Sequence, residues 1–332
     1  MSNENRGKGN GEAATGVVRP PSSIAPHASP ATRHPTLFTR NAAASEATHG
    51  AVRARLADGR WHFQHGPIDL VIGADGDPGA VAAATECAWL RFQTVLAELV
   101  AELKWLRRPV QDAAAVSAVV AARMVSATWP HRAKFITPMA AVAGAVADEL
   151  IECFRTDRRI VRAHVNNGGD IALHLAPGTH YRVGLVADLA RVKRRDHVDL
   201  DGDIEVGAEL PVRGIATSGW RGRSFSLGIA DSVTVLAANA ADADAAATMI
   251  ANAVNADHAA IVRRPASELK DDTDLGDRLV TVAVGRLPQE SVATALASGE
   301  EVARAMKADA LVWGAVLCLQ GSVRVVRADA LQ

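Results

Sequence analysis

Asp244 and Thr248, a carboxylate and a hydroxyl in a helix-like segment after the apolar run 233–237, could bind a metal ion. Four residues apart on a helix, the two side chains lie on one face. They offer the hard oxygen ligands that magnesium takes, and phosphate groups of a ligand could fill its remaining positions. A structural explanation competes, because acids near a helix N-terminus are favoured by the helix dipole. Asp242 already supplies such an acid, so Asp244 is predicted as a metal ligand together with Thr248.

Two polar loops could hold the ligand itself. The loop 166–170 contains five polar or glycine residues, more than a hairpin turn needs, and its glycines leave backbone N–H groups open. In the second loop, Ser218 fits a hydrogen-bond donor better than a nucleophile, because the flanking glycines of a nucleophile elbow are missing. Asp231 precedes a fully apolar strand, so it must lie exposed at the mouth of a site or pair with Arg221 or Arg223. The predicted ligand-binding residues are Asn166, Asn167, Gly168, Gly169, Asp170, Thr217, Ser218, Gly219, Ser226, Gly228 and Asp231.

Composition and charge exclude several classes of protein. The 332 residues are 48% hydrophobic, which is enough for a sizeable core, and the formal net charge is -1. Without a basic surplus, a nucleic-acid partner is not expected. Since no apolar run approaches the roughly 20 residues of a membrane span and no signal peptide is recognisable, we expect no membrane association and a cytoplasmic location. The three cysteines, Cys87, Cys153 and Cys318, are predicted as small core residues of a reducing compartment rather than a disulfide or zinc site.

The chain divides into a tail and one domain. Residues 1–50 lack apolar periodicity and hold five of the fourteen prolines, so they are predicted to form a disordered tail. Residues 51–332 are predicted to form a single domain whose elements follow from apolar spacing. The polar stretches 191–195 and 199–203 are predicted as solvent-exposed. The expected helices are 81–106, 113–129, 138–154, 241–254 and 291–306, and the expected strands are 52–56, 61–63, 68–72, 160–165, 171–175, 182–186, 233–237, 279–284, 311–319 and 323–326. Because hairpins dominate the second half, the fold class is α+β with a largely antiparallel sheet packed with helices.

The expected helix 138–154 has an unusually thin side. Ala140, Ala143, Gly144 and Ala147 share it. Such small residues let another backbone, or a flat ligand, come close. Tight packing of the helix against a sheet is the structural explanation.

Three motifs, taken in order, resemble the ApbE-like flavin transferases. They are Asn166-x-Gly168-Gly169-Asp170, Ala216-Thr217-Ser218-Gly219 and Ala243-Asp244-Ala245-x-x-Thr248. Ser-Phe-Ser-Leu-Gly-Ile-Ala-Asp-Ser-Val at 224–233 and Asp274-Leu-Gly-Asp277 are similar to a separate, largely uncharacterised bacterial and archaeal branch of that superfamily. The likeness runs from about residue 55 to the end of the chain.

This resemblance implies an ApbE-like layered fold and a bound FAD, FMN or other phosphorylated nucleotide-type cofactor. It also implies magnesium at Asp244 and Thr248, and transfer of the FMN portion of FAD to a threonine of a protein partner. No catalytic residue is predicted. Two departures are visible: the usual Asp-Pro-x-Thr-Gly-x-Pro segment after Gly219 is replaced by residues 224–231, and Ala143 stands where a lysine is usual. Two functions therefore stay open: a flavin or nucleotidyl-type transferase, and a non-catalytic or accessory protein of cofactor or sulfur (homocysteine) metabolism.

Overall fold

The computed structural model describes residues 50–112, 116–185 and 202–327. The predicted tail over 1–49 and the polar stretch 191–195 lie outside these residues, as does most of 199–203. The described strands are β1 (Val52–Arg55), β2 (Trp61–His65), β3 (Ile68–Gly76), β4 (Ile160–Asn167), β5 (Asp170–Leu175), β6 (His180–Leu185), β7 (Gly202–Gly207), β8 (Gly214–Ser218), β9 (Ser232–Ala237), β10 (Ile261–Pro265), β11 (Leu279–Val284), β12 (Gly314–Leu319) and β13 (Ser322–Val326). The described helices are α1 (Pro78–Leu106), α2 (Val119–Thr128), α3 (Val142–Arg155), α5 (Ala240–Ala253) and α6 (Gln289–Ala308).

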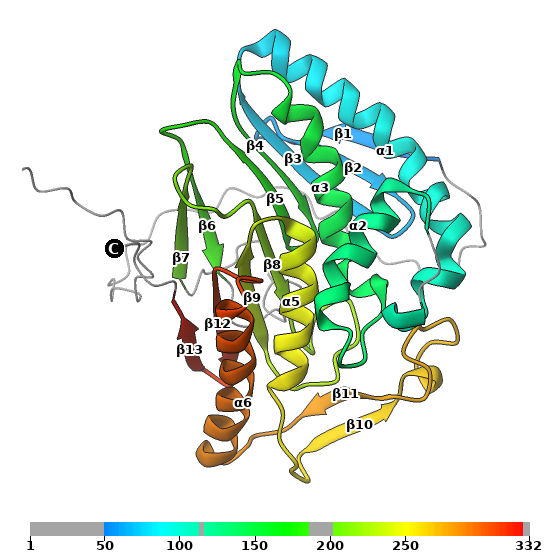
Figure 1. Cartoon of the computed structure of the whole chain (residues 1–332), viewed down its shortest axis with the longest axis vertical. Helices are drawn as coiled ribbons and strands as arrows, with labels where there is room; N and C mark the ends of the chain where they lie inside the picture. Colours follow the sequence, from blue (N-terminus) through cyan, green and yellow to red (C-terminus); the bar gives the residue numbers. More distant parts are fainter. Residues whose placement is uncertain (1–49, 113–115, 186–201, 328–332) are drawn as a thin grey trace, which may run out of the picture.

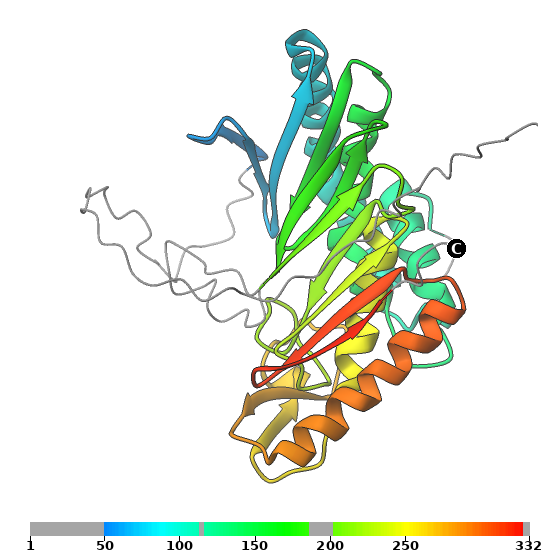
Figure 2. The same ribbon diagram turned by 90° about the vertical axis from the view of Figure 1, so that its left-hand side faces the viewer.

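A nine-stranded sheet in the order β1-β2-β3-β4-β5-β8-β9-β12-β13 forms the centre of the fold. Each neighbouring pair in it is antiparallel. The hairpins β6–β7 and β10–β11 form separate two-stranded sheets. Figure 2 shows the sheet turning progressively from β3 to β13, which is the twist expected of a wide sheet. The predicted α+β class with a largely antiparallel sheet is therefore confirmed.

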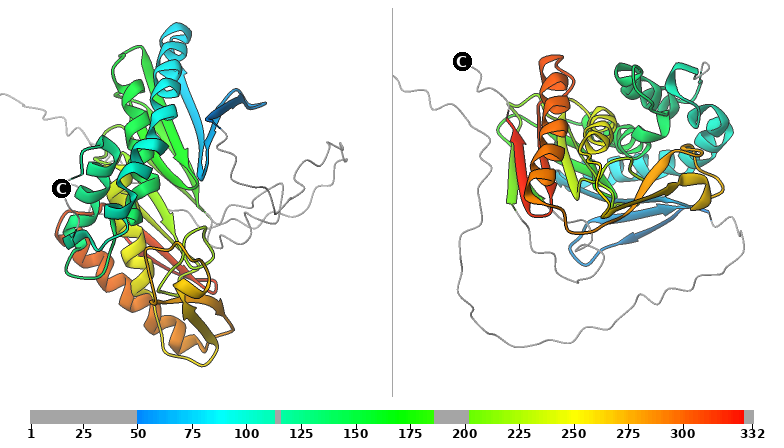
Figure 3. Two further views of the ribbon diagram at one scale, coloured as in Figure 1. Left: turned by 90° about the vertical axis from the view of Figure 1, so that its right-hand side faces the viewer. Right: turned by 90° about the horizontal axis from the view of Figure 1, so that it is seen from below.

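The helices lie in one layer on one face of this sheet (Figures 1 and 3). That face carries the main core, to which the strands contribute every second residue, such as Ala163 and Val165 of β4. The opposite face carries a smaller apolar cluster, which includes Leu173 of β5 and Val206 of β7. We call these the inner and the outer face of the sheet. A side chain's position along a strand therefore decides which face it reaches.

Helix α1 begins and ends close to the predicted positions. Asp77 caps it by accepting a hydrogen bond from the Ala80 N–H at 2.9 Å, and Pro78 occupies its first turn. Strand β3 extends to Gly76, four residues beyond the expected strand 68–72, so α1 follows it almost directly. The buried side of α1 repeats every three or four residues against the sheet and α3, through Ala80, Ala84, Ala88, Phe92, Val95, Leu99 and Leu106.

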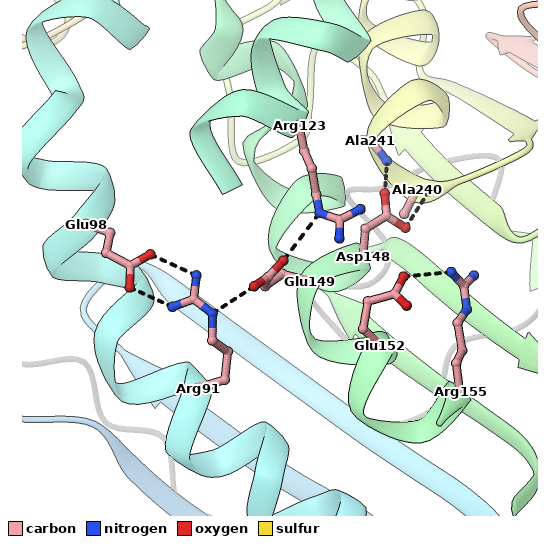
Figure 4. Close-up of polar contacts among 9 residues, drawn as sticks. All are labelled: Arg91, Glu98, Arg123, Asp148, Glu149, Glu152, Arg155, Ala240 and Ala241. Carbon is pink, nitrogen blue, oxygen red and sulfur yellow. Dashed lines mark hydrogen bonds and ion pairs between the residues drawn. The ribbon is translucent and has the colours of Figure 1, made fainter. Parts of the chain in front are cut away.

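A half-buried ionic network joins α1, α2 and α3 (Figure 4). Arg91 of α1 bonds Glu98 of the same helix at 2.7 Å and Glu149 of α3 at 2.8 Å. Arg123 of α2 reaches the other oxygen of Glu149 at 3.3 Å. Because Glu149 keeps only 12% of its side chain exposed, its two arginine partners are needed to offset the cost of burying its charge.

Helices α3 and α5 approach each other more closely than ordinary side chains allow. A Cβ atom on Gly144 would overlap the backbone carbonyl of Ala240 at the start of α5. The thin side of the predicted helix 138–154 therefore faces another helix backbone rather than the sheet. This close approach sets the geometry of the candidate site described below.

The cysteine prediction is wrong for two of the three residues. Cys87 of α1 and Cys153 of α3 form a disulfide, with their Cα atoms 5.9 Å apart and a sequence separation of 66. Cys87 is exposed rather than buried. Cys318 is buried, as predicted. Distance in sequence misled the prediction, because packing of α1 on α3 brings the two thiols together.

Among the described residues, no helix is both long and apolar enough to cross a bilayer.

Candidate functional site

The pleat of the sheet sorts the predicted loop residues onto two faces. Asn167 and Asp170 are a cross-strand pair, and Asn167 also pairs with Leu70, a residue of the main core. These side chains therefore lie on the inner face, beneath the helices. By the same alternation, Ser218 lies on the inner face opposite Val233.

Asn166 and Thr217 point the other way. The Thr217 hydroxyl meets the Thr234 hydroxyl at 2.9 Å, and the Asn166 side chain accepts from the Gly169 N–H at 2.8 Å, which closes the β4–β5 turn. Thr217 still contributes its backbone N–H to the inner face, where it donates to Asp170 Oδ1 at 3.2 Å. The structure thus brings together only part of each predicted loop.

Two aspartates accept hydrogen bonds across the α3–α5 contact, each from backbone N–H groups of the other helix. Asp148 of α3 accepts from the backbone N–H groups of Ala240 and Ala241, at 2.9 and 2.8 Å, in the first turn of α5. Figure 4 shows this side chain pointing directly at the start of α5. In return, Asp244 of α5 accepts from the Gly144 N–H at 3.1 Å, in the first turn of α3. Each helix therefore supplies an acid that caps the other, which the helix dipoles favour.

Asp244 and Asp170 form an acid pair at the inner face. Burial raises the pKa of Asp170 to about 7, while the Thr217 N–H and then Arg223 act to lower it. Burial also raises the pKa of Asp244 well above its usual range, and repulsion by Asp170 raises it further. Both residues nevertheless keep part of their surface exposed. The pair is thus reachable from solvent, and a bound cation would reduce the repulsion between the two carboxylates.

The exposed side of α5 continues from this pair along Asp244, Thr248 and Asn252. These residues are four apart and are partly exposed, whereas most of the helix is buried. Asn252 Oδ1 accepts from the Leu227 N–H at 2.9 Å and from the Ser226 hydroxyl at 3.3 Å. The structure therefore places Thr248 between the acid pair and the segment 224–228.

Gly228 and Gly219 serve backbone packing. A Cβ on Gly228 would overlap the Ala251 carbonyl near the end of α5, and one on Gly219 would come within 2.5 Å of the Asp231 carbonyl. Together with Ser226, they fix the path of the β8–β9 loop around α5 and β9. Their positions in the loop explain why glycine is needed there without any ligand.

Asp231 is buried and is hydrogen-bonded within the protein, away from the acid pair. It is 8% exposed and accepts from the Trp220 indole N–H at 3.2 Å and from the Gln320 backbone N–H at 2.6 Å. Arg221 lies 3.9 Å away. Of the two alternatives predicted for this carboxylate, the structure shows the paired one, with Arg221 as the nearby arginine.

Arg223, the other arginine considered for Asp231, lies beside the β4–β5 turn instead. Its guanidinium occupies the space that a Cβ on Gly168 would fill. It also acts on the charge of Asp170. The sequence suggested Arg223 as a partner of Asp231 because the two are only eight positions apart, whereas the loop places its guanidinium against Gly168.

The donor set at the acid pair fits magnesium. Within residues 50–112, 116–185 and 202–327, no three His, Cys, Asp or Glu side chains group closely enough to hold a metal by themselves. Magnesium commonly binds one or two carboxylates and takes its other ligands from water and phosphate. Asp170 and Asp244 provide two adjacent carboxylates whose negative charges burial and mutual repulsion leave uncompensated. The Thr248 hydroxyl, one helical turn from Asp244, provides a further oxygen ligand for the metal ion.

A surface cavity of about 270 Å³ lies away from these residues, between the segments 109–112 and 132–136 and Arg278. None of the predicted site residues lines it. Arg278 stacks there on the Phe135 ring, 3.5 Å from its centroid. We therefore base the candidate site on the acid pair rather than on this cavity.

A protein-family model described as AbpE bacteria matches residues 53–325 of the chain. A search of curated proteins gave no match.

Solved structures with some similarity include three of ApbE proteins. An ApbE protein from Thermotoga maritima shares 17% identity at a TM-score of 0.33, and the match covers 59% of this chain and 52% of that one. The flavin transferase ApbE from Vibrio cholerae shares 12% sequence identity at a TM-score of 0.32, and the match covers 84% of this chain and 98% of that one. A mutant of the same enzyme shares 11% identity at a TM-score of 0.38, and the match covers 84% of this chain and 97% of that one. The match thus spans about half the length of the Thermotoga chain.

Proposed function

The chain belongs to the family described as AbpE bacteria, and from this premise we propose that it binds a flavin nucleotide or a similarly phosphorylated cofactor together with magnesium. The observation that carries the proposal is the acid pair. Asp170 and Asp244 come from distant parts of the sequence, yet backbone N–H groups of β8 and α3 hold them close together at the inner face. The three family-like motifs named from the sequence contribute residues to this one region.

We assign separate roles to the residues around the pair. Asp244 and Thr248 hold the metal, and Asp170 adds the second negative charge beside it. Bound magnesium would neutralise phosphate oxygens of the cofactor. Ser218, on the inner face and half-buried, supplies a hydroxyl for a ligand oxygen, and Asn167 fixes the turn by donating to the Ala143 carbonyl at 3.1 Å.

The finer proposal is that the protein transfers the FMN portion of FAD to a threonine of a client protein. In that step a bond forms between the threonine oxygen and the phosphorus of FMN, and the phosphorus–oxygen bond to AMP breaks. The hydroxyl proton leaves to a base, and AMP is released. Positioning and charge neutralisation dominate catalysis of such phosphoryl-type transfers, which suits a site built from carboxylates and a metal.

Titration calorimetry with FAD and FMN, each with and without magnesium, tests the binding. We expect magnesium to strengthen FAD binding at least tenfold in the wild type, and Asp244→Asn to remove that gain while leaving the metal-independent part. Thr248→Ala should reduce it in the same direction. If the folded wild type binds neither flavin in either condition, the proposal is wrong.

The second candidate is a binding or accessory protein without turnover. It is favoured by Ala143, which stands where ApbE-like transferases usually have a lysine, and by the replaced segment 224–231. Mass spectrometry separates the two candidates. Release of AMP from FAD, with a mass gain of FMN on a threonine-containing acceptor, supports the transferase. Retention of intact FAD by the purified protein supports the binding protein.

A further inference from the structure

Arg223 lies at the edge of the candidate site, in space that Gly168 leaves open. The residue belongs to the β8–β9 loop, yet its guanidinium lies against Gly168 in the β4–β5 turn. Gly168 has a φ of 69°, which favours glycine, and any side chain there would overlap the guanidinium. The turn thus combines a backbone geometry and an open surface that together accommodate this arginine.

Arg223 interacts electrostatically with Asp170 but has no hydrogen-bond partner among the described residues. It also makes no ion pair within these residues, and its side chain is exposed. Arg221, two residues earlier, differs: its guanidinium stacks on the Trp220 ring at 4.7 Å and lies 3.9 Å from Asp231. One arginine of the loop is therefore engaged in holding the loop, while the other offers its donors at the site.

The charges of the site favour an anion next to Arg223. Asp170 and Asp244 carry two negative charges when ionised, which one divalent cation balances. Arg223 then leaves one positive charge in excess beside that cation. A guanidinium presents five N–H donors in a planar fork that matches the oxygens of a phosphate. An anion that bridges the metal and Arg223 would satisfy both.

We propose that Arg223 binds a phosphate group of the ligand held at the Asp170–Asp244 pair. Gly168 is required because any side chain at that position would displace the guanidinium. This inference rests on the proposed function for the location of the ligand, but it is independent of whether that ligand is a flavin. It gives the loop between β8 and β9 a role in recognising the phosphorylated part of the ligand.

Magnesium pyrophosphate is the minimal probe, and FAD with magnesium is the second, both measured by titration calorimetry. We expect Arg223→Gln to weaken pyrophosphate and FAD binding at least tenfold, and Arg223→Lys to recover only part of the loss because an ammonium lacks the fork. Arg304→Gln is the charge-matched control, since Arg304 pairs with Glu300 on α6. It should bind both probes as the wild type does.

A glycine pair provides a test that leaves the arginine in place. Gly168→Ala should weaken both probes, because the added methyl displaces the guanidinium. Gly178→Ala is its control: Gly178 has a similar φ of 80°, but nothing lies within 4 Å of its added Cβ. The two variants share the backbone strain, so equal binding by both would contradict the inference.

The outcomes separate the two proposals. Flavin binding that is unchanged in Arg223→Gln overturns the role of Arg223 and leaves the proposed function standing. Pyrophosphate binding that depends on Arg223, without any flavin binding, supports the role of Arg223 and overturns the flavin. Binding of neither probe by the wild type overturns both.

Discussion

Asp148 of α3 and Asp244 of α5 each accept a hydrogen bond from the first turn of the other's helix, yet their surroundings differ. Asp148 is 3% exposed, and each of its oxygens receives one N–H of α5. Asp244 is partly exposed, receives the Gly144 N–H on one oxygen, interacts more weakly with the Ala143 N–H and faces a second acid, Asp170. The same capping arrangement is thus complete at one end of the helix pair and incomplete at the other.

The difference shows which of the two carboxylates has interactions left for a ligand. A buried carboxylate is tolerated when hydrogen bonds and positive charge offset its desolvation. Asp148 meets part of that requirement with two N–H groups and, after them, the charges of Arg123 and Arg155, although burial still raises its pKa to about 6. Asp244 meets less of it, because repulsion by Asp170 adds to the effect of burial on its pKa. We infer that α3 and α5 use Asp148 for stability and keep Asp244 for function.

Removal of the two carboxylates gives the sharpest test of this comparison, and the largest expected effect. Asp148→Ala deletes two charge-assisted hydrogen bonds and leaves buried N–H groups at the start of α5, which should cost about 3 kcal/mol of unfolding free energy. Asp244→Ala loses one such bond but also removes the repulsion with Asp170. Its cost should stay within about 1 kcal/mol. Urea unfolding at neutral pH without magnesium measures both values.

Asp148→Asn serves as the control, since it keeps the shape and one acceptor oxygen, and it should fall between the two alanine variants. Equal losses for Asp148→Ala and Asp244→Ala would show that both acids are structural caps. The distinction drawn between the two helix ends would then be lost.

The close approach of the helices predicts opposite signs for two glycine substitutions. Gly144→Ala places a methyl group on the Ala240 carbonyl, so it should destabilise by about 2 kcal/mol and weaken magnesium-dependent binding by moving Asp244. Gly79→Ala, in the exposed first turn of α1, has only the Asp77 side chain nearby, at 3.3 Å. It should stabilise by up to about 1 kcal/mol through helix propensity. Thermal unfolding of the two variants measures the contrast, and a neutral Gly144→Ala would contradict the proposed packing.

The elements of this fold could largely be predicted from sequence, because apolar spacing reports burial. Helix α5 was expected at 241–254 and lies at Ala240–Ala253. Helix α1 was expected at 81–106 and begins three residues earlier, at the proline. Strand β10 (Ile261–Pro265) was not predicted, since its two arginines and its proline hide the pattern at the edge of a small sheet.

The site was less predictable, because its contacts join residues distant in sequence. The sequence indicated the surplus acid Asp244, but it could not show that Asp170 would lie beside it. It gave no sign of Asp148, whose partners are backbone atoms of another helix. The alternation along β4 and β8 could have separated the residues of each loop by face, had the strand ends been known. The position of Arg223 depends on the path of a loop, which spacing does not encode.

The pH dependence of stability tests the acid pair with the smallest expected effect. Burial raises the pKa of Asp170 from 3.8 to about 7 and that of Asp244 well above 3.8. The native state therefore binds these protons more tightly than the unfolded chain, so the stability they contribute is full below pH 3.8 and is lost as pH rises through about 7. Partial exposure screens the effect, and we expect about 1 kcal/mol between pH 5.5 and about 8, or roughly 2 °C in melting temperature.

Asp148 titrates in the same direction, with a pKa raised by burial to about 6, so the wild type alone cannot isolate the pair. The double variant Asp170→Asn with Asp244→Asn keeps Asp148 and should lose only the contribution of the pair. Its melting temperature should therefore fall less than that of the wild type as the pH rises. Saturating magnesium should cancel this difference at pH 8, because a cation between the carboxylates favours their ionised forms. If the wild type and the double variant follow one pH curve without metal, the two acids do not share a buried site, and Asp244 differs from Asp148 only in exposure.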